Sequence, residues 1–323
     1  MQKQVLITGV AGLIGSHLAE ALLAQDYYVV GVDNLITGKN KNLSTFITNP
    51  SFRLVELDIT QSFDSLKQML PESFELIFHL ASPASPPWYQ KYPRETYLAN
   101  TVGTDNLLLL LMENNRNGRF VYASTSEVYG DPQEHPQKES YWGNVNPNGA
   151  RSCYDESKRL GETICGVFAR QHAIDTRISR IFNTYGPRLD PADGRIISNF
   201  INQALRGEKL TIYGNGEQTR SYCYVADLVA GLIKLATEPA AKNQTVNLGN
   251  PEEMTVTETA RSVYRAVHQS SADPEIEFLP LPSDDPVRRR PDISLAHSLL
   301  GWQPTTPFTE GIAKTIEWFR AQT

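Results

Sequence analysis

The segment Gly9-Val10-Ala11-Gly12-Leu13-Ile14-Gly15 limits the possible folds of this chain most strongly. It follows a short apolar run at residues 5–8 and precedes residues 13–24, whose apolar spacing predicts a helix. Glycine permits a tight turn after a strand, and the helix behind it offers N–H groups and a positive dipole to an anion. This order of strand, glycine loop and helix is typical of a parallel α/β sheet.

The first half of the chain repeats the alternation of strand and helix. Continuous apolar strands separated by helices predict a parallel sheet covered on both faces. The expected fold class is therefore α/β, with a doubly wound sheet of the Rossmann type. The further predicted strands are residues 28–32, 52–57, 76–80 and 120–123, and the predicted helices are 96–112 and 154–172.

The second half is less regular, and its prolines cluster at 274–291 and 304–307. It predicts a smaller α+β lobe suited to binding a substrate. We assign residues 1–183 to the sheet domain, with return segments near 221–250, and residues 184–323 mainly to this lobe. The predicted strands here are 210–213, 221–224 and 245–248, and the predicted helices are 197–206, 225–237, 256–268 and 308–320.

An acidic residue supports a dinucleotide as the ligand of the glycine loop, which alone could be a turn without a ligand. Asp33 ends the second predicted strand, 18 residues after Gly15. A carboxylate at that point accepts hydrogen bonds from the adenosine ribose. It would also repel a 2′-phosphate, so NAD is favoured over NADP. Asp58, after the third strand, fits an adenine contact and a loop-capping role equally well.

Tyr154 and Lys158 form the candidate catalytic pair. Four residues apart, they would share one face of the helix at 154–172. A nearby ammonium and a nicotinamide cation both favour the phenolate, so the phenol could act as a general base near neutral pH. Alone, this spacing occurs by chance in many helices.

The pair, the glycine loop and the segments His79-Leu80-Ala81 and Ala123-Ser124-Thr125 together resemble the extended short-chain dehydrogenase/reductase family. The resemblance implies that Thr125 hydrogen-bonds the reacting hydroxyl; otherwise it is an ordinary residue at a strand end. It also implies NAD contacts at Gly9, Gly12, Leu13, Ile14, Gly15, Asp33, Asn34, Gly38, Asp58, Ile59, Leu80, Ala81, Ser82, Ser124, Tyr154 and Lys158.

Ser126 and Glu127 narrow the chemistry. Sugar-nucleotide dehydratases of this family carry an Asp-Glu pair here, whose Asp protonates the departing hydroxyl. The galactose epimerases carry small uncharged residues instead. Glu127 preceded by Ser126 suits a reaction that needs one proton relay but no loss of water, and decarboxylation of a uronic acid fits that requirement.

Longer blocks resemble the UDP-glucuronate decarboxylases, also called UDP-xylose synthases, over nearly the whole chain. The departures are Val10, Ser157 and Trp88, where the family often has glycine, glycine and a smaller polar residue. Trp88 makes substrate contacts in its loop less secure. The matching blocks are His79-Leu80-Ala81-Ser82-Pro83-Ala84-Ser85-Pro86-Pro87, Ser124-Thr125-Ser126-Glu127-Val128-Tyr129-Gly130-Asp131-Pro132, Cys153-Tyr154-Asp155-Glu156, Ile181-Phe182-Asn183-Thr184, Asn247-Leu248-Gly249-Asn250-Pro251-Glu252-Glu253 and Arg289-Arg290-Pro291-Asp292-Ile293.

This resemblance implies a three-step reaction on UDP-glucuronic acid. Tyr154 takes the proton of the sugar C4 hydroxyl, oriented by Thr125, while C4 passes hydride to NAD, and Lys158 holds the phenolate and the cofactor ribose. The 4-keto uronic acid then loses carbon dioxide, because its carboxylate is β to a ketone. Glu127 relays a proton to C5, and the hydride returns to C4. The product is UDP-xylose, with NAD regenerated.

Arginines are needed because the substrate carries a diphosphate and a carboxylate. The resemblance implies that Arg220 grips the diphosphate and that Arg289 lies near the sugar carboxylate as part of the catalytic set. Read without its flanking residues, the run at 288–290 would instead be a solvated basic turn. The resemblance implies further substrate contacts at Asn183, Arg188, Arg195 and Tyr213.

Composition excludes several classes of protein. Apolar residues make up 40% and charged residues 20% of the chain, as in ordinary globular proteins. The net charge of −6 predicts no nucleic-acid partner. The three cysteines form no CxxC pair, which argues against disulfides and a cysteine zinc site and favours a reducing compartment. The six histidines lack metal-ligand spacing, so no metal is expected.

Location and assembly follow from the apolar segments. The first strand begins at residue 5, leaving no room for a signal peptide, and no apolar run approaches the ~20 residues of a membrane span. We therefore expect a cytoplasmic protein without a membrane partner.

Five leucines at 107–111 predict a helix covered on more than one side, either within the core or in a dimer. We expect a homodimer, because family members commonly pair through this helix and the Tyr154 helix.

Two other kinds of function remain possible. One is a related nucleotide-sugar decarboxylase, branching synthase, dehydratase or epimerase. The other is a catalytically silent NAD-binding module that senses redox state or scaffolds partners. Such modules typically lose the tyrosine or the lysine, whereas Tyr154, Lys158 and Thr125 are all present here.

Overall fold

The structure, a computed structural model, describes residues 2–280 and 288–322. Its centre is a seven-stranded sheet in which every neighbouring pair is parallel, in the order β11-β6-β5-β4-β1-β2-β3. This confirms the predicted α/β class. The strands are β1 (Gln4–Thr8), β2 (Tyr28–Asp33), β3 (Phe52–Glu56), β4 (Leu76–His79), β5 (Arg119–Thr125), β6 (Asp175–Ile181) and β11 (Thr245–Leu248).

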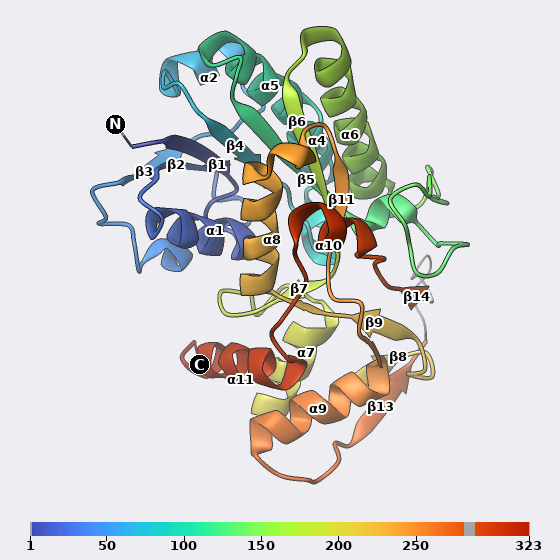
Figure 1. Cartoon of the computed structure of the whole chain (residues 1–323). Helices are drawn as coiled ribbons and strands as arrows, with labels where there is room; N and C mark the ends of the chain where they lie inside the picture. Colours follow the sequence, from blue (N-terminus) through green and yellow to red (C-terminus); the bar gives the residue numbers. More distant parts are fainter. Residues whose placement is uncertain (1, 281–287, 323) are drawn as a thin grey trace.

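Helices cover both faces of this sheet, because its strands are apolar on both sides (Figure 1). Within β1, Val5 and Ile7 pack into one core cluster and Leu6 packs into the other. The first cluster includes residues of α1 (Leu13–Leu23) and α8 (Val225–Thr237), and the second includes residues of α2 (Phe63–Met69), α5 (Val102–Asn114) and α6 (Ser152–His172).

The prediction of one helix over residues 96–112 is wrong. Two helices occupy this stretch, α4 (Pro93–Asn100) and α5, with a break at Thr101. The backbone of Thr101 has φ −114° and ψ −72°, and Gly103 beside it packs tightly against the side chain of Ile59. Leu107, Leu108, Leu110 and Leu111 are all buried within the chain, so the leucine run is covered without a second copy.

Most of the remaining elements form a second part below the sheet in Figure 1, but Ser294–Leu300 (α10) packs against β11 and α8, and Asn40–Leu43 (η1) packs against α1. The predicted strand over 221–224 is wrong in one detail, since it is divided at Tyr222 into β9 (Thr219–Ser221) and β10 (Cys223–Tyr224). The other elements are α3 (Pro86–Lys91), β7 (Thr184–Tyr185), α7 (Ile196–Leu205), β8 (Leu210–Tyr213), β12 (Glu253–Thr255), α9 (Val256–His268), β13 (Ile276–Leu279), β14 (Arg288–Arg289), α10 (Ser294–Leu300), α11 (Phe308–Arg320) and the 3-10 turns η1 (Asn40–Leu43), η2 (Ser126–Tyr129) and η3 (Pro239–Ala241).

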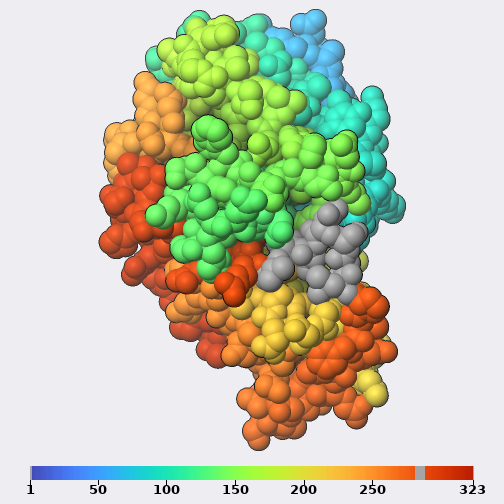
Figure 2. Space-filling model, turned by 90° about the vertical axis from the view of Figure 1, so that its right-hand side faces the viewer, coloured from blue at the N-terminus to red at the C-terminus, as the bar shows by residue number. Residues whose placement is uncertain are grey.

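One edge of the sheet gathers the loops that the sequence marked. Because the strands are parallel, Thr8, Asp33, His79 and Thr125 all stand at the same carboxyl edge, where ligands of such folds bind. Figure 2 shows the chain between β5 and α6 as a green surface layer above the second part. In the described part of the chain, no helix is both long and apolar enough to span a membrane.

Candidate active site

The glycine loop joins β1 to α1 and brings two backbone segments into close contact. Gly9 has a φ of +72°, and a Cβ there would lie 2.8 Å from the backbone nitrogen of Ala81. A Cβ at Gly15 would collide with the carbonyl oxygen of Gly9, whereas one at Gly12 would meet only that oxygen, 3.3 Å away. No side chain caps α1 here. The N–H groups of its first turn, from Leu13 onward, therefore fit a pyrophosphate.

Asp33 lies at the end of β2 with its carboxylate largely buried. Its Oδ2 accepts a hydrogen bond from the backbone N–H of Ala11 at 2.9 Å, and its Oδ1 accepts one from Leu35 at 2.8 Å. Burial raises the pKa of this carboxyl, against the effect of the two N–H donors. A Cβ at Gly38 would lie 2.6 Å from Oδ1. The carboxylate thus fixes the loop and remains placed to accept ribose hydroxyls.

Asp58 caps its loop and lies where the predicted adenine contact could form. Its Oδ1 accepts hydrogen bonds from the backbone N–H and the hydroxyl of Thr60, at 2.9 and 2.8 Å, so it caps its loop. It also lines a cavity at the sheet edge, and the amide of Asn34 reaches its Oδ2 at 3.4 Å. The predicted NAD residues that line this cavity are Gly9, Gly12, Asp33, Asn34, Gly38, Asp58, Ile59, Leu80, Ala81 and Ser82.

The sequence reading missed one wall of this cavity. Arg94, Glu95, Leu98 and Ala99 of α4 line it, as does Thr37. No sequence motif indicates the four α4 residues. Their spacing predicts a helix, but it does not show which face of that helix meets the cavity. The glycine loop, the acceptor at Asp33 and this enclosed approach fit a bound NAD, and these residues would hold it.

Tyr154 and Lys158 lie on the inner face of α6, both buried. Lys158 Nζ donates a hydrogen bond to the carbonyl oxygen of Ala123 at 2.7 Å and lies 5.8 Å from the centre of the Tyr154 ring. Burial raises the pKa of Tyr154 to about 12, although a hydrogen bond with Thr125 opposes the rise. Burial also lowers the pKa of Lys158 to about 7. The protein alone therefore keeps the phenol protonated, contrary to the simple expectation from a nearby ammonium.

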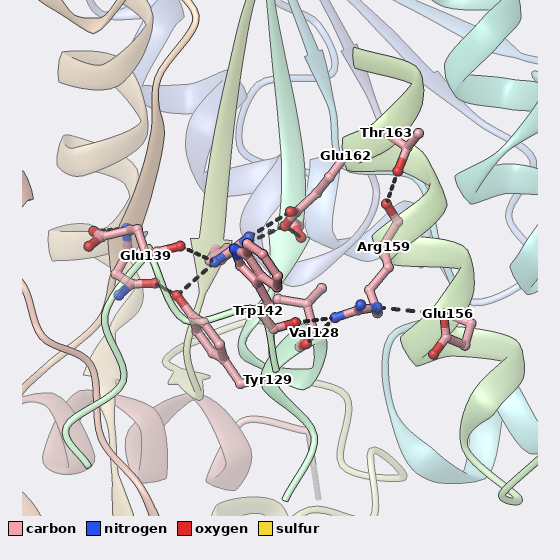
Figure 3. A network of polar contacts seen from close by, with 11 residues as sticks. Val128, Tyr129, Glu139, Trp142, Glu156, Arg159, Glu162 and Thr163 are labelled. Atoms are coloured by element: carbon pink, nitrogen blue, oxygen red, sulfur yellow. Dashed lines mark hydrogen bonds and ion pairs between the residues drawn. The ribbon is translucent and has the colours of Figure 1, made fainter. Parts of the chain in front are cut away.

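Thr125 and Ser124 point in different directions at the end of β5. Thr125 contacts Tyr154, and its Oγ1 accepts a hydrogen bond from the N–H of Glu127 at 3.3 Å. Ser124 Oγ instead donates to Glu162 of α6 at 2.5 Å. Figure 3 shows Glu162 in a polar network with Tyr129 and Glu139. The hydrogen of the Ser124 hydroxyl is therefore directed to α6.

Glu127 lies in η2 between two guanidinium groups, and its side chain is 14% exposed. One carboxylate oxygen accepts a hydrogen bond from Arg289 and the other accepts one from Arg151. Burial would raise the pKa of Glu127, but the charges of Arg289 and Arg151 outweigh it and lower the pKa. The carboxylate is therefore held ionised beside Tyr154.

Arg289 and Arg220 are paired residues on the neighbouring strands β14 and β9. Both are buried, although Arg288 beside them is exposed, so the basic run is not a solvated turn. Arg220 donates to the carbonyl oxygen of Thr219 at 2.8 Å, and its charge also lowers the pKa of Glu127. The Nε of Arg289 is buried without a hydrogen-bond partner among the described residues.

The other predicted substrate residues are not all close to this cluster. Arg195 forms a two-bond ion pair with Asp193, and its charge opposes the rise in the Tyr154 pKa that burial causes. Asn183 lies between β6 and β7, next to the end of the sheet. Arg188 instead contacts Glu20 of α1 at 2.7 Å. Tyr213 stands at the end of β8 and is 43% exposed.

Three residues beside Tyr154 were missed. Arg151 holds Glu127, as described above. Tyr89 of α3 stacks on the Tyr154 ring, with centroids 5.2 Å apart and planes at 8°. Burial, then the charge of Glu127, raises the pKa of Asp155 to about 7. A basic residue three positions before the catalytic tyrosine was the available signal for Arg151; Tyr89 is distant in sequence and gave none.

His79 lies beneath the site at the end of β4. Its Nδ1 is 2.8 Å from the hydroxyl of Thr8, and its Nε2 is 3.1 Å from the carbonyl oxygen of Ala99. Burial, and secondarily the charge of Lys158, lowers its pKa to about 3, so the ring is neutral. Within the described ranges, no cluster of three His, Cys, Asp or Glu side chains is arranged to hold a metal ion.

Comparisons with known proteins agree with this site. Residues 5–249 match the NAD dependent epimerase/dehydratase family. UDP-glucuronic acid decarboxylase 1 of Xenopus tropicalis is 47% identical, over 99% of this chain and 73% of its own. UDP-glucuronic acid decarboxylase 3 of Arabidopsis thaliana is 48% identical, over 98% of this chain and 89% of its own.

A solved structure shares the whole fold. UDP-glucuronic acid 4-epimerase from Bacillus cereus, in complex with UDP-glucuronic acid and NAD, is 28% identical to this chain and superposes with a TM-score of 0.87. The match covers 99% of this chain and 100% of the epimerase. With its glycine loop, its Tyr154–Lys158 pair and this identity over nearly its full length, the chain belongs to the NAD-dependent epimerase/dehydratase family and, within it, to the UDP-glucuronic acid decarboxylases.

Proposed function

We propose that this chain converts UDP-glucuronic acid to UDP-xylose and carbon dioxide, with NAD as a recycled cofactor. The observation that carries the proposal is the ionised Glu127, held by Arg151 and Arg289 beside Tyr154, with Ser126 in place of an aspartate. This arrangement offers a carboxylate for proton relay and lacks the acid that expels water in a dehydratase.

Tyr154 is the proposed base for the C4 hydroxyl, and Thr125 orients that hydroxyl. NAD held at the glycine loop would supply the acceptor for the C4 hydride and the donor that restores it. Because burial raises the pKa of Tyr154 to about 12, the phenolate needs a positive charge that binding brings to the site. Lys158, fixed on the Ala123 carbonyl, holds the phenol and the cofactor ribose in place.

Arg289 binds the sugar carboxylate and keeps it next to Glu127. Oxidation at C4 places a ketone β to that carboxylate, and loss of carbon dioxide leaves an enolate between C4 and C5. C5 then gains a proton from solvent, and the ionised Glu127 is proposed to orient the water that delivers it. Bidentate guanidinium contacts suit both a carboxylate and a diphosphate, so Arg220 is proposed for the diphosphate.

The proposal includes further contacts. The charge of Arg195 acts on Tyr154, and Asn183 follows β6, whose Ile181 pairs with Thr125. Arg188, bound to Glu20, would have to exchange that partner to reach substrate. Tyr213 is exposed enough to contact the uridine end. Ser124 is proposed to contact NAD only through its backbone.

A homodimer is part of the proposal. The leucine run no longer supports it, since those side chains are covered within the chain. Its support is that Val102 of α5 and Leu160 of α6 are 39% and 50% exposed on two helices that pack together. Light scattering would give twice the 36.1 kDa chain mass.

The three cysteines form no disulfide, which supports the proposed reducing, cytoplasmic compartment.

The deciding experiment incubates purified protein with UDP-glucuronic acid and NAD and follows the products by NMR together with carbon dioxide release. UDP-xylose without net reduction of the cofactor is the expected result. Formation of the 4-epimer of the substrate would favour the epimerase alternative, which is the activity in the name of the Bacillus cereus protein. A dehydrated 4-keto product would favour a dehydratase, and NAD binding without turnover would favour a silent module.

A further inference from the structure

The segment that carries Arg289 is fastened to the sheet domain at one buried residue. Gln137 is fully buried, and its Oε1 accepts a hydrogen bond from the N–H of Arg290 at 2.8 Å. Its backbone N–H donates to the carbonyl oxygen of Arg290 at 2.9 Å, and its own carbonyl accepts from Asp292 at 2.8 Å. Two of these hydrogen bonds thus fix Arg290, the residue next to Arg289, and the third fixes Asp292.

Asn247, at the edge of the sheet, holds Gln137 in turn. Its Nδ2 donates to the carbonyl oxygens of Gln137 and Asp292, at 3.0 and 3.1 Å. Its Oδ1 accepts from the hydroxyl of Tyr129 at 2.7 Å. Tyr129 belongs to η2, the same turn as Glu127. The Asn247 side-chain amide of β11 therefore holds both the turn that carries Glu127 and the segment that carries Arg289.

The network continues into the sheet. The guanidinium of Arg180 in β6 donates to the hydroxyl of Tyr129 at 3.1 Å and to the carbonyl oxygen of Glu139 at 2.9 Å, and it pairs with Glu162 of α6. Figure 3 shows Tyr129, Glu139 and Glu162 in this arrangement. Buried polar networks that are fully hydrogen-bonded specify one geometry, because any other leaves polar groups unpaired.

We infer that Gln137 is a positioning residue for the reaction: through the backbone of Arg290 it sets the place of Arg289 against Glu127, and hence against the substrate carboxylate. This inference rests on the proposed role of Arg289. Gln137 touches no reacting atom. The amide has two uses at once, because its Nε2 also donates to the carbonyl oxygen of Glu134 at 2.8 Å and so fixes its own orientation.

The test compares Gln137→Met, which keeps the length of the side chain and removes the amide, with Gln137→Glu, which keeps an acceptor for Arg290. The exposed Gln133→Met is the matched control. All are made in a Tyr154→Phe background, so that turnover of UDP-glucuronic acid is slowed at least about a hundredfold while its binding is measured. Dissociation constants for UDP-glucuronic acid and UDP-xylose are measured by calorimetry with NAD present.

Gln137→Met is expected to raise the dissociation constant of UDP-glucuronic acid about tenfold or more. The dissociation constant of UDP-xylose, which has no carboxylate, should rise less than about twofold. Gln137→Glu should recover most of the loss, and Gln133→Met should change neither constant. Equal weakening of both ligands would mean a merely structural role and would overturn the inference, as would no change in either.

A second readout uses the active protein. Glu127 faces Arg289, Arg151 and Arg220, with Tyr154 and Asp155 nearby. A displaced Arg289 would let the pKa of Glu127 rise, so the acidic limb of the kcat/KM profile should move to higher pH in Gln137→Met. An unmoved limb contradicts the inference.

The Arg289→Lys variant tests the proposed function separately. If it binds UDP-glucuronic acid as tightly as the parent does, the proposed role of Arg289 in binding the carboxylate fails. That result is distinct from failure of the inference about Gln137.

Discussion

The guanidinium of Arg289 pairs with the carboxylate of Glu127, a residue 162 positions earlier in the chain. Arg151 completes the arrangement from the residue before α6. A carboxylate with two such partners stays ionised although little of it reaches solvent. Removing either partner should therefore affect both the stability of the protein and its chemistry.

Arg151→Gln should lower the free energy of unfolding at pH 7 by about 1–3 kcal/mol, because a buried carboxylate loses one of its charged donors. The lowered pKa of Glu127 adds stability above the unfolded value near 4.5, and this stability is lost as pH falls. The deficit of the variant should thus stay constant from pH 7 to about pH 5 and shrink as the pH falls below about 4.5, as measured in urea titrations.

The exposed Arg265→Gln, which loses only a surface pair with Asp273, is the control and should stay within about 0.5 kcal/mol of the parent. A deficit in Arg151→Gln that does not shrink below about pH 4.5 would contradict the electrostatic explanation.

Tyr154→Phe should reduce turnover of UDP-glucuronic acid by about 10²–10⁴-fold, since the ring and its stacking on Tyr89 remain while the proton acceptor is lost. NAD affinity should change little. Initial rates of carbon dioxide release and a fluorescence titration with NAD measure the two quantities. Turnover within threefold of the parent would remove Tyr154 from the proposed mechanism.

Gly12→Ala and Gly15→Ala should differ in kind. A methyl group at Gly12 meets only one backbone oxygen at 3.3 Å, so that variant should fold and lose at least about tenfold in NAD affinity, or 1.4 kcal/mol. A methyl group at Gly15 collides with the loop itself and should lower the melting temperature without NAD. The two variants are compared by calorimetric melting and NAD titration, and equal melting temperatures would refute the packing role of Gly15.

His79 should make the protein less stable in acid. Its folded pKa is lowered to about 3, whereas the unfolded ring titrates near 6.5, so the unfolded state binds more protons between these values. The stability that depends on a neutral ring is present above pH 6.5 and is lost as pH falls toward 3. In His79→Gln this contribution is absent. The stability advantage of the parent over that variant should therefore decrease from pH 7 to pH 4, as measured by denaturant unfolding.

Local patterns predicted most of the sheet, because its strands are continuous apolar runs. β6 escaped prediction, since Arg177 and Arg180 interrupt its apolar residues. The structure accounts for both: Arg177 is buried against Asp175, and Arg180 is paired with Glu162. The break at Thr101 was also unpredicted, because it depends on a distant contact between Gly103 and Ile59.

The same division holds for the site. The glycine loop, Asp33 and the Tyr154–Lys158 pair are each local and were found from spacing. Gln137 and Tyr89 act through partners far away in the sequence, so no window around them indicates a role. The direction of a side chain such as Ser124, which faces Glu162, likewise depends on what packs against it. The bounds assigned to the two domains stay a prediction.

The order of the sheet has a consequence for synthesis of the chain. β6 pairs with β5 on one side, but its other neighbour, β11, comes from residues 245–248. A nascent chain that has emerged only as far as Ile181 therefore presents an unpaired strand edge, which is a template for association with other chains. The ribosome must add more than sixty further residues before this edge is covered. A fragment cut at residue 183 should accordingly aggregate, and chaperones would act on this interval of translation.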